Sequence, residues 1–190
     1  MSINAETLGL LIRRSTVRIC AGPPTTRETS MNIFWLDKDV HLCVKYHCDK
    51  HVVKMILEYA QLMCTAHHVL DGSLAPSPLY KSTHVNHPCA VWVRQSSANY
   101  LLLYDLFIAL CEEYTYRYGK EHLTYTKLRV PLSLPPVNTP QIALTQPPQC
   151  MPEEFHSKNV VEGYRNYYNK SKYRIARWTK RETPPWFNYK

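Results

Sequence analysis

The feature that most constrains the fold is a helical repeat of apolar residues that runs from about Cys48 to Val69. Apolar side chains recur every three or four positions, which places them on one side of a helix, and three more lie beside them. These positions are Val52, Ile56, Ala60 and Met63, with Val53, Leu57 and Cys64 at the edge. We expect this helix to end near Gly72, because glycine readily adopts the left-handed conformation of a helix C-cap.

A second repeat predicts a helix from about Ala90 or Ser96 to Tyr118, where Gly119 ends it. Its apolar stripe consists of Leu103, Phe107, Leu110 and Tyr114. A last helix is expected over 157–179, before the sequence TPPWF interrupts it. Residues 130–152 (VPLSLPPVNTPQIALTQPPQCMP) are rich in proline and lack periodicity, which indicates an ordered but irregular connection. We therefore predict a mainly α, compact single-domain fold with a long irregular Pro-rich connection.

The first 30 residues differ from the rest of the chain. Their end, AGPPTTRETS, is polar and turn-forming, and it is followed by MNIFWLD, which is typical of a strand or a buried segment. The length of 190 residues suits one domain. We expect residues 31–190 to form the helical domain. Residues 1–30 are then an N-terminal extension, either disordered or upstream of a functional start at Met31.

Compartment and membrane association follow from simple counts. No apolar run approaches the roughly 20 residues needed to span a bilayer. The N-terminus lacks the basic and apolar regions of a secretory signal. The seven cysteines are dispersed and form no Cys-x-x-Cys pair. These features predict an intracellular protein with reduced thiols that is neither secreted nor bound to a membrane, and we expect a monomer.

A stripe of polar residues lies between the apolar positions of the first helix. Successive members are three or four positions apart and share one face. They are His47, His51, Lys54, Glu58, Gln61, Thr65 and His68. The stripe has three interpretations, of which the simplest is a solvated polar face that Asp49 caps.

The second interpretation is a metal site, because His47 and His51 stand at i and i+4. Further ligands would come from Cys48 and from His67, His84 or His87. A His-x-x-x-His pair without a second ligand pair is common by chance, so we expect no metal and no other cofactor.

The third interpretation is a catalytic face centred on Glu58, which lies on the stripe between Leu57 and Tyr59. A half-buried carboxyl group has a raised pKa and can act as an acid or base near neutral pH. Lys54 lies one turn earlier and offers the competing role of a structural salt-bridge partner.

The positive charge of the chain is concentrated at its C-terminus. Residues 158–190 hold nine Lys and Arg against two Asp and Glu, or +7 of the total of +8. The candidate phosphate-binding residues there are Arg165, Lys170, Lys172, Arg174, Arg177, Lys180 and Arg181. Tyrosine and tryptophan are interleaved with them, and such side chains stack on exposed bases. This composition predicts a nucleic-acid partner. In the competing interpretation, the aromatic residues pack into the core and the charged residues only increase the solubility of the protein. The residues expected to pack include Tyr164, Tyr168, Ile175 and Trp178.

Four stretches occur in a recognisable order: DKHVVKMILE from Asp49, HHVLDG from His67, the long stretch NHPCAVWV…YTYRYG from Asn86 to Gly119, and YRNYYNKSKYRIARW. Together they resemble the pyrimidine-dimer DNA glycosylase family, of the phage endonuclease V type. That family has an Asp-polar-His segment ending in Arg-Glu, a Lys-His-Val turn, a His-Pro start to a long helix that ends in Arg-Gly, and a Trp- and Tyr-rich end. The resemblance covers about residues 31–181.

The resemblance implies an endonuclease V-like fold that binds damaged double-stranded DNA, flips a base and cuts the glycosidic bond. In the family, the free α-amine at the chain start forms an imine with the sugar C1′, and a first-helix glutamate, which corresponds to Glu58, stabilises the sugar intermediate. Leu57 stands where the family has arginine, and Gln61 lies near its next arginine. Because Met31 precedes Asn32, a context unsuited to methionine removal, Lys54 is the alternative imine-forming residue.

Three hypotheses follow. The first is a glycosylase/AP lyase-type enzyme with Glu58, Lys54 and His51 as catalytic residues and His87, Arg94 and His68 as substrate-binding residues. The second is a nucleic-acid-binding protein that has kept this fold without its chemistry. The third is a metal-dependent nuclease or hydrolase that uses His47 and His51.

Overall fold

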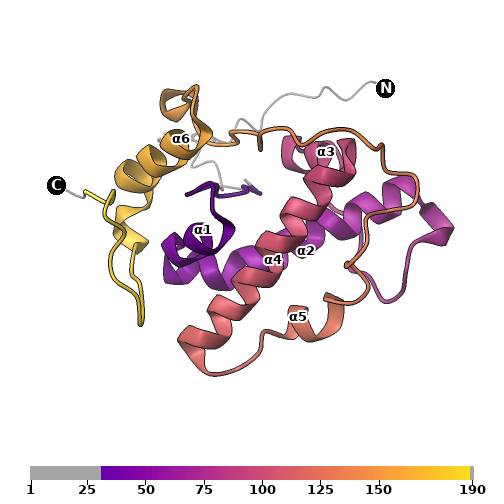
Figure 1. The fold of residues 1–190 in the computed structure, drawn as a ribbon, viewed down its shortest axis with the longest axis horizontal. Coiled ribbons are helices and arrows are strands. Elements are labelled where there is room, and N and C mark those ends of the chain that lie inside the picture. The colour runs from indigo at the N-terminus through magenta and orange to yellow at the C-terminus, as the bar shows by residue number, and fades with distance from the viewer. Residues whose placement is uncertain (1–30, 189–190) are drawn as a thin grey trace, which may run out of the picture.

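Two helices of 22 residues, α2 (Asp49–Leu70) and α4 (Ser97–Tyr118), pack against each other and form the frame of the molecule. The computed structural model describes residues 31–188. Around the frame lie four shorter helices: α1 (Val40–Tyr46), α3 (Pro88–Gln95), α5 (Leu123–Leu128) and α6 (Val160–Tyr167). Figure 1 shows α2 running behind α4, with α6 set apart at the end that carries the C-terminus. No strand occurs within 31–188, so the predicted mainly α class is confirmed.

The ends of the two long helices follow local sequence signals. Ser96 is extended, and its hydroxyl accepts from the Ala98 amide at 3.1 Å, so it separates α3 from α4 and caps the latter. Gly119 ends α4 with a φ of 70°, in the left-handed region that glycine tolerates. At the other frame helix, Gly72 has a φ of 54° just after α2. The predicted ends of both helices are confirmed.

The buried side of α2 differs in one respect from the predicted one. Val52 and Ile56 are fully buried, as are Ala60, Met63 and Cys64. Val53 and Leu57, however, are 44% and 40% exposed. The core instead extends to the other edge of the stripe, over Met55, Tyr59, Leu62 and Ala66, because α3, α4 and α5 all pack on α2.

The Pro-rich connection 130–152 is ordered without regular structure, as predicted. Figure 1 shows it passing from α5 around the far end of α2 and over α3 to α6. Side chains of the frame hold its backbone. The Asp71 carboxylate accepts from the Val137 amide at 2.9 Å, and Asn99 Oδ1 accepts from the Thr145 amide at 2.9 Å. Such bonds replace a strand or helix ladder as partners for the backbone.

The last helix is shorter than predicted. After α6 the chain makes a π-turn, η3 (Tyr168–Lys172), and a 3-10 turn, η4 (Tyr173–Ile175), and then becomes irregular. Tertiary bonds draw this part back onto α1 and α2, because Trp178 Nε1 donates to the Tyr46 carbonyl at 2.9 Å. The predicted packing of Tyr164, Tyr168, Ile175 and Trp178 is confirmed: the two tyrosines are fully buried and the other two pack against the core.

The remaining expectations concern membrane spans, the cysteines and the N-terminal extension. No helix within the described residues is long and apolar enough to cross a membrane. Six cysteines within 31–188 are free thiols. The expected N-terminal extension, residues 1–30, lies outside the described residues.

Candidate functional site around Glu58

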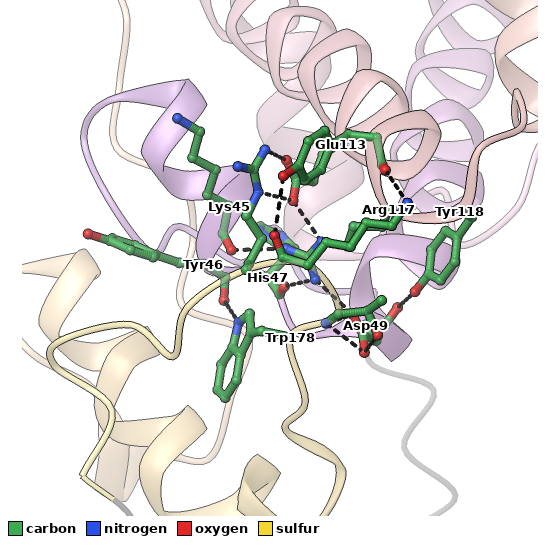
Figure 2. Close-up of polar contacts among 12 residues, drawn as sticks. Lys45, Tyr46, His47, Asp49, Glu113, Arg117, Tyr118 and Trp178 are labelled. Carbon is green, nitrogen blue, oxygen red and sulfur yellow. Dashed lines mark hydrogen bonds and ion pairs between the residues drawn. The ribbon is translucent and has the colours of Figure 1, made fainter.

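The first turn of α2 is the centre of a closed polar network (Figure 2). Arg117, fully buried on α4, donates from Nη1 to Asp49 Oδ1 at 2.9 Å and from Nε to Glu113 Oε1 at 2.7 Å. Its remaining contacts are with the carbonyl oxygens of His47 and Lys45, each at 3.0 Å. The charged groups of Arg117, Asp49 and Glu113 are all paired, so this network holds α1, α2 and α4 together.

The two histidines considered as a metal pair, His47 and His51, belong to the core. His47 is the C-cap of α1, and its two ring nitrogens lie 2.8 Å from the Cys43 carbonyl and 3.2 Å from Tyr59 Oη. Burial lowers the pKa of His47 to about 4. His51 stacks on Phe34, with ring centroids 4.2 Å apart, and Nδ1 hydrogen-bonds Tyr168 Oη. Burial also holds the pKa of His51 well below its ordinary value. These contacts favour a packing role for both.

Glu58, two turns further along α2, has a different environment. Its Oε1 pairs with Lys54 Nζ at 2.9 Å, and its side chain is 12% exposed whereas that of Lys54 is 56% exposed. Its Oε2 is buried, and no hydrogen-bond partner for it exists within 31–188. Burial raises the pKa of Glu58, while Lys54 and the nearby His84 act in the opposite direction. The helix thus presents a carboxylate with one oxygen satisfied and the other available.

Residues 80–87 form a loop that α2 holds beside Glu58. Thr65 Oγ1 donates to the Thr83 carbonyl at 3.1 Å and accepts from the Thr83 amide at 3.2 Å. One turn later, His68 Nε2 lies 2.9 Å from the Tyr80 carbonyl. His68, predicted to bind substrate, therefore contacts this loop. Together with Thr65 it fixes the position from which His84 acts on Glu58.

Two basic residues, Arg94 and His87, lie at the end of this loop. Arg94 Nη1 reaches back along α3 and donates to the Val85 carbonyl at 2.6 Å. His87 is the N-cap of α3, where its Nδ1 accepts from the Cys89 amide at 3.2 Å. Burial and the neighbouring His84 lower the pKa of His87. Lys54 and His84 thus act directly on Glu58, whereas His87 is linked to it only through His84 and Arg94 only holds the loop backbone.

Sequence reasoning missed two cysteines at this site. Cys89 and Cys150 are 61 positions apart, yet their sulfur atoms are 3.5 Å apart. Cys89 is also close enough to Glu58 for that carboxylate to raise the pKa of its thiol, although the hydrogen bond to Cys150 and burial have larger effects. A backbone hydrogen bond links Cys89 to Ile33. No spacing signal could have paired these cysteines, because Cys150 lies in the aperiodic connection.

The buried segment around Ile33 lies at the same place. Met31 and Asn32 are buried, and Tyr164 Oη donates to Asn32 Oδ1 at 3.3 Å. The sequence MNIFWLD was predicted to be a strand or a buried segment, and it is a largely buried segment that forms no strand. The beginning of the described chain therefore reaches the cluster that contains Glu58.

The basic residues of the C-terminal segment divide into two groups. Arg165 pairs with Asp37 at 2.7 Å, Arg181 pairs with Glu113 at 2.8 Å, and Lys172 is buried over the Tyr167 ring. The other four are exposed: Lys170, Arg174, Arg177 and Lys180. The first group contributes to the fold, and the second remains available to a polyanion.

A hollow of about 820 Å³ lies elsewhere, between α1, α4 and α5. Its lining includes Lys38, Asp105, Glu112 and Arg129. None of the predicted site residues lines it, so it is separate from Glu58.

Comparison with known proteins finds no matching family model, no matching curated protein and no matching solved structure. The function is therefore argued from the geometry of this chain.

Proposed function

We propose that the protein is a DNA-acting enzyme of the glycosylase/AP lyase type in which Glu58 is the acid/base or cation-stabilising group. The observation that carries the proposal is the buried, unpartnered Oε2 of Glu58 beside two basic side chains, Lys54 and His84. A carboxylate in such a position can stabilise the oxocarbenium-like charge that develops when a glycosidic bond breaks. A raised pKa also suits proton transfer near neutral pH.

Lys54 supplies the amine in this proposal. Its Nζ lies 2.9 Å from Glu58 Oε1, close enough to pass a proton to that carboxylate. The neutral amine would then bond to the sugar C1′ while the base leaves with the electron pair of the glycosidic bond. One proton then passes from the nitrogen to the ring oxygen as the C1′–O bond of the sugar breaks, which gives a protonated imine that borohydride reduces to a stable adduct.

In this proposal, basic side chains bind the phosphates of the DNA. Arg94 stands on α3, which packs on α2, and four exposed basic residues stand on the C-terminal segment. Each Lys or Arg that neutralises a phosphate releases a counterion, so binding would weaken steeply with salt. His51 has no part in the chemistry of this proposal because it packs between Phe34 and Tyr168.

The second candidate is a binding protein without chemistry. The pairing of Lys54 with Glu58 favours it, because a persistent ion pair occupies the amine that would have to attack. The exposed Leu57 in place of the family's arginine favours it too.

The test is incubation with duplexes that carry pyrimidine dimers, abasic sites or modified bases, followed by borohydride trapping. Glu58→Gln should lower strand cleavage by about 100-fold or more, whereas Glu112→Gln, an exposed mid-helix control on α4, should not. Lys54→Gln should abolish the trapped adduct, and Lys50→Gln on the same helix should retain it. Salt-sensitive binding without cleavage or adduct, unchanged by Glu58→Gln, would establish the binding protein instead.

A further inference from the structure

Three potential metal ligands converge where α3 begins. One ring nitrogen of His87 and the sulfurs of Cys89 and Cys150 all lie within 4.8 Å of one another. Cys89 is fully buried, whereas His87 and Cys150 are half-buried, so the cluster opens toward the surface on one side. We propose that these residues bind one zinc-class divalent ion through two thiolates and one imidazole.

The spacing of the two sulfurs fits such an ion. Two thiolates on one tetrahedral zinc, with bonds of about 2.3 Å, are about 3.8 Å apart. The observed separation is 3.5 Å. A disulfide requires about 2.05 Å between the sulfurs. The sulfurs therefore stand close to the separation that a shared ion imposes, and would need small shifts to accept one.

Backbone groups donate to both sulfurs. Ile33 provides a backbone hydrogen bond to Cys89, and the Cys89 backbone provides one to Cys150. An ion bound by both sulfurs would displace the two thiol protons to solvent and leave each sulfur with a backbone hydrogen-bond donor, as in the outer shell of many metal sites.

His87 is prepared for ligation by its present bond. Its Nδ1 already presents a lone pair to the Cys89 amide at 3.2 Å, so the proton of the neutral ring is on Nε2. An ion can take that lone pair without a change of tautomer, while the Cys89 amide keeps its contact with Cys150. The ligands are neutral imidazole and thiolate, which suit zinc better than magnesium or calcium.

Three protein ligands leave the fourth position of a tetrahedral ion to water, as in catalytic zinc sites. This site differs from the predicted pair His47 and His51, and from the expectation that no metal binds. It does not depend on the glycosylase proposal, because ion binding is measured without DNA.

The experiment titrates the full-length, reduced protein with Co²⁺ and then with Zn²⁺. Thiolate ligation gives Co²⁺ an intense near-ultraviolet charge-transfer absorption, and tetrahedral geometry gives strong visible bands. We expect one equivalent of Co²⁺, both signatures, and displacement by Zn²⁺. A thiol count on the denatured sample confirms that neither cysteine is oxidised during the titration.

Cys89→Ala, Cys150→Ala and His87→Gln should each weaken ion binding by more than about 100-fold. Cys111→Ala is the buried-cysteine control. His122→Gln is a matched control for His87, because His122 also caps a short helix, with Nδ1 accepting from the Thr124 amide at 3.2 Å. Both controls should bind the ion normally and so separate ligation from folding. Absence of the charge-transfer band in reduced protein, or binding that survives the three ligand variants, would overturn the proposal.

Discussion

The two ends of the polar stripe on α2 use similar residues for different purposes. At the first turn, Asp49 meets the buried Arg117, which is fully enclosed by oxygen acceptors (Figure 2). Two turns later, Glu58 meets an exposed lysine and keeps one oxygen buried without a partner. Both carboxylates are on one helix and both have a cationic neighbour. The difference is whether the fold itself completes the set of hydrogen bonds.

A closed network stabilises a fold, and an open one costs stability unless a ligand completes it. The structure is therefore consistent with a structural role for the first turn and a functional role for the Glu58 region. That contrast can be tested separately from any enzymatic assay.

The largest effect is expected from Arg117→Met, which removes a fully buried guanidinium from Glu113 and Asp49 and leaves them only their weaker partners, Arg181 and Thr179. Breaking a buried ion pair from one side costs about 3–5 kcal/mol. Urea denaturation measures this as a loss in the free energy of unfolding. Arg94→Met, whose described hydrogen bond is to the Val85 carbonyl, should cost less than about 1 kcal/mol. Equal losses in the two variants would remove the distinction between the closed and open ends.

At the closed end, His47 should make the free energy of unfolding depend on pH. The pKa of His47 in the folded protein is about 4, against 6.5 for a free histidine, because burial disfavours the charged ring. The unfolded chain therefore binds more protons between those values, and the free energy of unfolding falls as pH drops through that range. The contribution of His47 is on the order of 3 kcal/mol. In His47→Gln the slope of stability against pH over this range should be shallower, and an unchanged slope would contradict the assignment.

Two arginines of the C-terminal segment offer a smaller comparison. Arg181 pairs with Glu113 and stacks on Tyr116, whereas Arg177 is exposed. Arg181→Gln should lower the free energy of unfolding by about 1 kcal/mol and leave DNA affinity nearly unchanged. Arg177→Gln should change stability by less than about 0.5 kcal/mol but reduce the salt dependence of DNA binding by about one counterion. Fluorescence titrations at several salt concentrations measure the second effect, and interchangeable behaviour of the two variants would refute this division of the basic residues.

The same contrast explains what the sequence could predict. Periodicity located α2 and α4 and placed Lys54 beside Glu58, because those features depend on residues within one or two helical turns. It did not show which arc of α2 would face solvent. The predicted apolar edge therefore includes Leu57, which is 40% exposed. The short α6 and the pairing of Cys89 with Cys150 depend on tertiary contacts between distant segments, and no local pattern encodes these.

The effect most specific to the open end is a gain in stability on removal of Glu58. A buried unsatisfied oxygen costs about 1–3 kcal/mol, whereas loss of a largely exposed lysine pair costs less than about 1 kcal/mol. Glu58→Met should therefore raise the free energy of unfolding at pH 7 by about 1 kcal/mol. Methionine is preferred to glutamine here because an amide would leave another polar group in the same dry position.

The sign of the pH dependence follows from the direction of the pKa shift. Because the pKa of Glu58 is raised in the folded protein, the folded state binds more protons, and stability falls as pH rises from the ordinary value near 4.5 through the raised one. The advantage of Glu58→Met should thus shrink as the solution is acidified below that window. At the closed end, Asp49→Leu should lose stability at pH 7, since it removes the acceptor of Arg117 and of Thr179. Denaturation of both variants at pH 4 and pH 7 makes the comparison, and a loss of stability in Glu58→Met at pH 7 would place Glu58 with the structural residues.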